Sequence, residues 1–107
     1  MNEVGVTDAL YRAIAEASLE APSGQAILAE TLLIAKMLIG KNARYGDSAL
    51  APLRIFSKAN ATEQLLVRID DKISRIRRTG IGEAADEDTL ADLIGYLILL
   101  RLSLAGA

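Results

Sequence analysis

Residues 91–100 read ADLIGYLILL, a run in which Asp92 is the only charged side chain. Apolar residues occupy nearly every direction around a helix formed by this run, so such a helix should be buried on most sides. Burying an ionised carboxylate costs on the order of several kcal/mol unless a cation or several hydrogen-bond donors surround it. Asp88 lies one turn earlier on the same face. The run therefore predicts a core helix that presents two acids together.

The rest of the chain is also predicted to be helical, because no segment alternates polar and apolar residues and no hairpin signal occurs. Breaks are expected at Pro22 to Gly24 and at Thr79-Gly80. Asn60 and Glu63 have the spacing of a capping box. The expected helices cover residues 7–19, 24–42, 60–78 and 86–104, and residues 41–59 are expected to form a loop with a short helical piece. We expect one all-α domain over residues 1–107, a four-helix bundle.

The composition predicts a self-assembling protein and restricts the chemistry it can use. Of its 107 residues, 51% are hydrophobic and 4% aromatic, more apolar surface than one small core buries, which favours a homodimer or homotetramer. The chain has no cysteine and no histidine. Thiolate-bound zinc and an imidazole base are therefore excluded. A bound metal would need oxygen ligands, which favours Mg²⁺ or Mn²⁺.

The charge pattern gives no indication of nucleic-acid or membrane binding. The net charge is −2, and the short basic stretch of residues 75–78 has no interleaved aromatic side chain. The first residues lack the pattern of a signal peptide, and the apolar run that ends at Arg101 is too short to cross a bilayer. We therefore expect a cytoplasmic protein, located in the host cytoplasm if a phage encodes it.

Acidic side chains on helices are the first group of candidate site residues. Asp88 and Asp92 can share one cation, and Glu30 is expected to be buried on a second apolar helix. Asp70 and Asp71 are adjacent on the third helix, so at most one of them points fully into the same site. A dipole role for Asp88, a structural ion pair for Asp92 and partial exposure of Glu30 are the alternatives. The candidate catalytic residues are Glu30, Asp70, Asp88 and Asp92, and the candidate metal ligands are these four and Asp71.

Cationic side chains and one loop form the second group. Lys72 and Arg75 lie on the third helix beside acids, a mixture that suits a metal-bound polyphosphate, although a solvated helix face gives the same pattern. The sequence KNARYGDS at residues 41–48 is rich in hydrogen-bond donors and contains one aromatic side chain. It is either a ligand-contacting loop or a plain connection. The candidate substrate-binding residues are Lys72, Arg75, Lys41, Asn42, Tyr45 and Asp47.

Three segments together resemble the MazG-like all-α nucleoside triphosphate pyrophosphohydrolases, most closely the small phage-type MazZ (d)GTP diphosphohydrolases. They are YGDS at residues 45–48, RIDDKISR at residues 68–75 and EDTLADLIGY at residues 87–96. The family pattern has E-x-x-E on one helix and E-x-x-D on a later one. Asp92 matches the final acid of that pattern, whereas Thr89 stands where the preceding glutamate is expected. Asp71 is followed by Ser74 where an acid is expected.

The resemblance implies Mg²⁺-dependent hydrolysis between the α and β phosphates of a nucleoside triphosphate, with (d)GTP as the expected substrate. Glu30 or Asp70 would complete the metal ligands, and Lys72 and Arg75 would hold the departing pyrophosphate. The resemblance also implies assembly as a dimer or tetramer. The alternative from a different class is a non-catalytic helical interaction module, whose acids pair with lysine and arginine side chains across helix interfaces.

Overall fold

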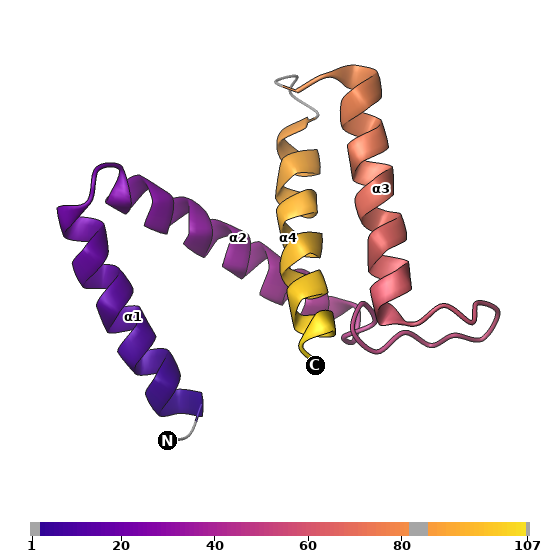
Figure 1. Cartoon of the computed structure of the whole chain (residues 1–107), viewed down its shortest axis with the longest axis horizontal. Helices are drawn as coiled ribbons and strands as arrows, with labels where there is room; N and C mark the ends of the chain where they lie inside the picture. The colour runs from indigo at the N-terminus through magenta and orange to yellow at the C-terminus, as the bar shows by residue number, and fades with distance from the viewer. Residues whose placement is uncertain (1–2, 82–85, 107) are drawn as a thin grey trace. The chain divides into compact units, whose positions relative to one another are not determined.

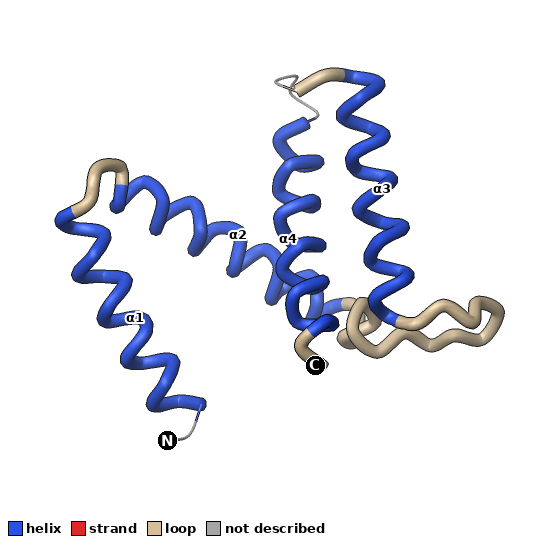
Figure 2. Tube along the Cα trace, viewed as in Figure 1, coloured by secondary structure: helices blue, strands red, loops and turns tan. Residues whose placement is uncertain are grey.

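The computed structural model describes residues 3–81 and 86–106. These residues form four α-helices, α1 (Glu3–Glu20), α2 (Gly24–Arg44), α3 (Ala61–Thr79) and α4 (Asp86–Leu104) (Figure 1). The described residues contain no β-strand (Figure 2). The expected all-α fold class is confirmed, and the helices begin and end within a few residues of the expected positions.

The chain divides into two compact units, Met1–Lys36 and Met37–Ala107. Unit 1 contains α1 and the larger part of α2. Unit 2 contains the last turns of α2, the loop that follows, α3 and α4.

Close backbone contact fixes the turn between α1 and α2 in unit 1. Gln25 donates a hydrogen bond from Nε2 to Ser18 Oγ at 2.8 Å, and the Gly24 N–H donates to the Ala21 carbonyl at 3.0 Å. Ser23 has a φ of 59°. A Cβ atom added to Gly24 would lie 2.4 Å from the Ser18 carbonyl oxygen. Because that neighbour is backbone, the turn requires glycine at this position.

Two glycine substitutions in α2 are expected to have opposite effects on stability. Gly24→Ala forces α1 and α2 apart and should destabilise unit 1 by about 1–3 kcal/mol. Gly40 has nothing within 4 Å of an added Cβ, so Gly40→Ala should stabilise the helix by up to about 1 kcal/mol. Thermal unfolding followed by far-UV circular dichroism measures both effects. Equal effects of the two substitutions would contradict the close approach at Ser18.

In unit 2, α3 and α4 pack against each other in antiparallel directions (Figure 1). Thr62 near the start of α3 and Ser103 near the end of α4 share a hydrogen bond of 2.6 Å between their hydroxyl oxygens. Leu65 and Ile69 from α3 and Leu99 from α4 are buried. These apolar contacts, with the buried Thr89 and Gly95, form the core of unit 2.

Capping residues explain where α3 begins and ends. The Asn60 side-chain oxygen accepts a hydrogen bond from the Glu63 backbone N–H at 2.9 Å, which satisfies one of the free donors of the first turn. At the other end, Gly80 has a φ of 81°, and its N–H donates to the Ile76 carbonyl at 2.7 Å. The expected start at Asn60 and stop at Thr79-Gly80 are both confirmed to within one residue.

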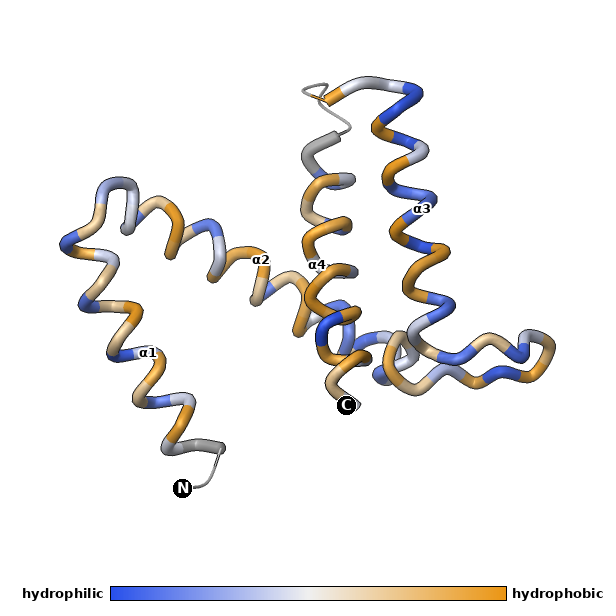
Figure 3. The backbone as a smooth tube through the Cα atoms, viewed as in Figure 1, coloured by the Kyte–Doolittle hydropathy of each residue, from blue (hydrophilic) through white to orange (hydrophobic). Residues whose placement is uncertain are grey.

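Helix burial is lower than the sequence predicts. The tube of α4 is hydrophobic along most of its length (Figure 3), yet Ile94, Leu97 and Ile98 are between 39% and 45% exposed. A helix packed along one side by α3 cannot bury its whole circumference. On α3, Leu65 and Ile69 are buried, whereas Leu66 and Ile73 are exposed. None of the described helices combines the length and hydropathy needed to cross a bilayer.

Candidate functional site

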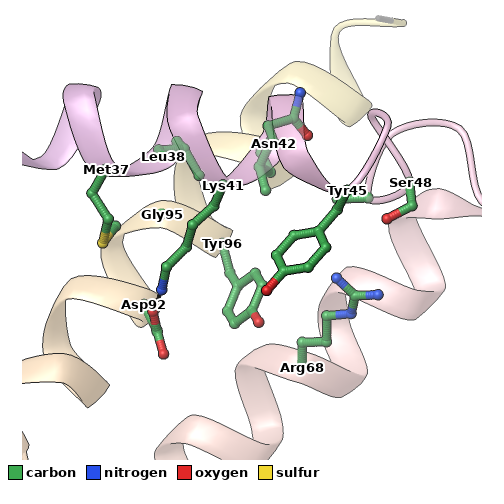
Figure 4. Close-up of a pocket in the computed structure, with 12 residues that line it drawn as sticks. Met37, Leu38, Lys41, Asn42, Tyr45, Ser48, Arg68, Asp92, Gly95 and Tyr96 are labelled. Atoms are coloured by element: carbon green, nitrogen blue, oxygen red, sulfur yellow. Dashed lines mark hydrogen bonds and ion pairs between the residues drawn. The ribbon is translucent and has the colours of Figure 1, made fainter.

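A cavity of about 180 Å³ opens in unit 2 where the end of α2 meets α3 and α4. Met37, Leu38 and Leu99 give it an apolar side. Its polar wall comes from three helices (Figure 4) and contains Lys41, Asn42, Tyr45, Arg68, Asp92 and Tyr96. Polar groups from separate elements that converge on a partly apolar cavity are typical of ligand sites.

Several residues in and beside the polar wall occur in pairs that are four residues apart in sequence, about one helical turn. Lys41 lies in the last turn of α2 and Tyr45, four residues later, directly follows that helix. Asp92 and Tyr96 have the same spacing on α4. On α3, Lys72 lies four residues after Arg68, which places both cations on one face. The (i, i+4) spacing therefore brings a charged group and an aromatic ring to the pocket from α4 and from the end of α2, and on α3 it places Lys72 beside the pocket residue Arg68.

Asp92 forms an ion pair with a different lysine on each of its carboxylate oxygens. Lys41 Nζ is 3.0 Å from Oδ1, and Lys72 Nζ is 3.2 Å from Oδ2. The side chains of Asp92 and Lys72 are 22% and 20% exposed, while that of Lys41 is 41% exposed. The pair with Lys72 is therefore the better shielded from water, and it links α4 to α3. The structural ion pair, one alternative from the sequence, is observed at Asp92.

The ion pair between Lys41 and Asp92 shifts the pKa values of both residues. Burial raises the pKa of Asp92, but the interactions with Lys41 and Lys72 together lower it by more than burial raises it. The pKa of Asp92 therefore lies below its ordinary value of 3.8. The hydrogen bond to Asp92 raises the pKa of Lys41 above its ordinary value of 10.5. Asp92 and Lys41 are therefore both charged at neutral pH.

Acid should selectively remove the contribution of Asp92 to stability. Because its pKa is lower in the folded chain, the ionised carboxylate stabilises the fold above the unfolded pKa, and this contribution disappears as pH falls through the folded value. At neutral pH we expect Asp92→Asn to lower the free energy of unfolding by about 1 kcal/mol. This difference from wild type should vanish below pH 3.8, where the carboxylate is progressively protonated.

Denaturant unfolding of wild type and Asp92→Asn at a series of pH values measures this dependence. Asp71→Asn, which removes an exposed carboxylate from the middle of α3, is the matched control. A difference between wild type and Asp92→Asn that stays constant into strong acid would contradict the ion-pair assignment.

A tight turn after α2 positions the loop side of the pocket. Gly46 and Asp47 both have left-handed backbone angles, with φ of 62° and 61°. Asn42 donates a hydrogen bond from Nδ2 to Asp47 Oδ1 at 3.0 Å, and the Asp47 N–H donates to the Asn42 carbonyl at 3.0 Å. Asp47 thus orients Asn42, a pocket residue, and is itself exposed outside the wall.

Gly95 lets the end of α2 approach α4 closely below the pocket. A Cβ atom at this position would lie 3.2 Å from Leu38 Cδ1 and 3.8 Å from Met37 Cε. The absence of a side chain on Gly95 therefore leaves room for the apolar groups of α2 beside Asp92, which precedes it on α4, and Tyr96, which follows it.

The structure brings part of the predicted site together. Lys41, Asn42, Tyr45 and Asp92 line the pocket, and Lys72 joins them through its ion pair. The other candidates are exposed and lie outside the wall: Asp70, Asp71, Arg75 and Asp88 in unit 2, and Glu30 in unit 1. The expected burial of Glu30 is therefore not observed.

The acids of one chain do not fit the expected magnesium site. Across residues 3–81 and 86–106, no three acidic side chains are grouped closely enough to hold one metal ion. Asp92 is already neutralised by two ammonium groups. Thr89, which stands where the family pattern has a glutamate, is 1% exposed and lies in the core of unit 2, where an ionised side chain would be costly.

Arg68 and Tyr96 are pocket residues that the sequence-based set of candidates omits. The Arg68 guanidinium carbon lies 5.9 Å from the centroid of the Tyr96 ring, within the range of a cation–π contact. Their spacing of four residues from Lys72 and Asp92 was the signal that could have identified them. In Figure 4 the side chain of Lys41 extends from α2 toward Asp92, and the side chain of Arg68 projects from a different helix.

No family model matches the chain, and no match is found among the curated proteins or the solved structures compared with it.

Proposed function

We propose that the chain is a nucleoside triphosphate pyrophosphohydrolase that binds the polyphosphate of its substrate in the pocket of unit 2. The observation that carries the proposal is that Lys41 and Arg68 line a pocket that holds one carboxylate, Asp92, and that a third cation, Lys72, is ion-paired with this carboxylate. Three cations against one acid suit an anion with several negative charges. The resemblance to MazG-like enzymes supports the reaction and suggests (d)GTP as substrate.

The size of the cavity indicates which part of a nucleotide it would hold. At about 180 Å³ it is smaller than the roughly 300–1,000 Å³ of typical sites for whole organic ligands. We therefore place the phosphates inside and the base at the rim, where Tyr45 is 65% exposed and available for stacking. The Arg44 guanidinium carbon lies 5.9 Å from the Tyr45 ring centroid and would support a stacked base from the other side.

The pocket residues offer the groups that this hydrolysis needs. Lysine and arginine side chains would neutralise phosphate oxygens as charge develops on the departing pyrophosphate. Asp92 would accept a proton from the attacking water, since the chain has no histidine. Water attacks the α phosphorus, the bond to the bridging oxygen breaks, and the products are a nucleoside monophosphate and pyrophosphate. The resemblance implies Mg²⁺ or Mn²⁺ as cofactor, to which we assign no ligand in a single chain.

We further propose that the active form is a homodimer or homotetramer in the cytoplasm that binds neither nucleic acid nor membrane. Exposed apolar side chains support assembly, including Val67 on α3 and Leu97 on α4. A MazG-like bundle would then form between copies of the chain. Size-exclusion chromatography with light scattering measures the assembly, and a monomer at micromolar concentration would contradict it.

The test of the proposed reaction is pyrophosphate release from each of the common nucleoside triphosphates, in both ribose and deoxyribose forms, with Mg²⁺ or Mn²⁺. We expect release from dGTP and GTP above that from the pyrimidine nucleotides. Each reaction is repeated with the nucleoside diphosphate, which cannot release pyrophosphate and controls for phosphatase contamination. No release from any triphosphate would refute the proposal.

A non-catalytic interaction module is the second candidate, and one observation favours it. Asp92 is paired with lysines from α2 and α3, which is how a purely structural acid would be accommodated between helices. A module of this kind predicts no thermal stabilisation by any nucleotide with Mg²⁺. The enzyme predicts an increase in melting temperature with its substrate, because ligands that bind the folded state stabilise it.

A further inference from the structure

The lysine pairs of Asp92 occupy both of its carboxylate oxygens. Lys41 donates a hydrogen bond to Oδ1 at 3.0 Å, and Lys72 Nζ forms an ion pair with Oδ2 at 3.2 Å. The lysines belong to different helices. Lys41 and Asp92 line the pocket (Figure 4), and Lys72 is joined to it through its ion pair with Asp92. In the ligand-free chain, the cations best placed to hold a phosphate are therefore already engaged by an anion of the protein itself.

More positive than negative side chains lie in and beside the pocket. Arg68 lines the same cavity, so Lys41, Lys72 and Arg68 together exceed the single carboxylate by two positive charges. A ligand with at least two negative charges, such as a diphosphate or triphosphate, can neutralise the excess. To approach both lysines closely, such a ligand has to weaken or break their hydrogen bonds to Asp92.

We infer that Asp92 is an internal competitor of the polyphosphate for Lys41 and Lys72, and thereby sets the affinity of the pocket for polyanions. The inference rests on the proposed binding of phosphates in this pocket. It also accounts for the misfit between the expected magnesium ligands and the observed pairs: two ammonium groups stand beside Asp92 where the resemblance places a divalent ion. Removal of the carboxylate should therefore strengthen the binding of a polyanion in the absence of metal.

The test is isothermal titration calorimetry of the full chain with inorganic tripolyphosphate in the presence of EDTA. Asp92→Asn is expected to bind about 10-fold more tightly than wild type, because the ligand no longer displaces a charged hydrogen-bond partner. Glu63→Gln is the matched control. It removes one negative charge from an exposed position on α3 outside the pocket wall, and should change the affinity by less than about 2-fold.

Three results would overturn the inference. Unchanged or weaker binding by Asp92→Asn would mean that the carboxylate holds the lysines in place for the ligand. An equal gain with Glu63→Gln would mean that net charge alone sets the affinity. Absence of tripolyphosphate binding in wild type and both variants would show that the pocket is not a polyanion site. Circular dichroism checks folding, and Asp92→Ser replaces Asp92→Asn if the latter does not fold.

The calorimetry is independent of catalysis, so the two proposals can fail separately. Tighter tripolyphosphate binding by Asp92→Asn without pyrophosphate release from any nucleotide would refute the hydrolase and keep the internal competitor. Pyrophosphate release by the wild type without a gain in affinity for Asp92→Asn would refute the internal competitor and keep the hydrolase.

Discussion

Asp92→Asn is expected to lower the rate of pyrophosphate release by on the order of 10²–10⁴-fold, the range for loss of a positioned proton acceptor. Asp92 is the carboxylate that lines the pocket among the described residues, and the asparagine amide has nearly the same shape but cannot accept the proton. The measurement is kcat at saturating dGTP with a coupled pyrophosphate assay.

Binding and turnover should change in opposite directions in this variant. If Asp92 competes for the lysines and also serves the reaction, Asp92→Asn combines a much lower kcat with tighter binding of polyphosphate than wild type. Asp71→Asn, which removes an exposed acid from α3, tests whether any nearby charge has the same effect. A kcat for Asp92→Asn within a few-fold of wild type would exclude Asp92 as the proton acceptor.

Arg68→Met is expected to raise KM for the triphosphate by about 10-fold, the effect of losing one charged hydrogen bond to a phosphate. Arg68 lies in the pocket wall beside Tyr96, and methionine retains much of its apolar stem while removing its charge. The smaller expected change in kcat follows from a role in binding both the substrate and the transition state. Steady-state kinetics over a range of dGTP concentrations measures the two constants.

Arg75→Met is the matched control for this substitution. Arg75 lies on the same helix and is exposed outside the pocket wall, so its loss should change KM by less than about 2-fold. The comparison also decides between two assignments, because the sequence analysis places Arg75 in the substrate site and omits Arg68. A larger effect at Arg75 than at Arg68 would contradict the pocket as the phosphate site.

The helices were predictable because their boundaries depend on local signals. Pro22 and Gly24 interrupt the chain, Asn60 caps the start of α3, and Gly80 adopts the left-handed backbone angle that ends it. Each signal acts over a few residues and needs no knowledge of the tertiary structure. The division into two units and the extent of burial depend on long-range packing, which local patterns do not contain.

The sequence allowed several residues of the site to be predicted, but not the contacts between them. Asp92 was conspicuous because a charge stood in an apolar run, but Lys41, its partner, is 51 residues away in sequence. The spacing of Lys72 on α3 placed it beside acids without showing that its partner would lie on α4. Full burial of α4 was expected from its composition, whereas α3 covers only one side of it in unit 2.

The short hydrogen-bonded turn that follows α2 holds several pocket residues in place together. Lys41 and Asn42 belong to the final turn of that helix and Tyr45 directly follows it, while Asp47 holds Asn42 by two hydrogen bonds of 3.0 Å. Fraying of these turns would withdraw a cation, an amide and an aromatic ring from the cavity in one movement, and would release one of the two lysines from Asp92 at the same moment. Ligand binding and the order of the last turn of α2 are therefore coupled. We expect a bound ligand to slow amide hydrogen exchange at the end of α2.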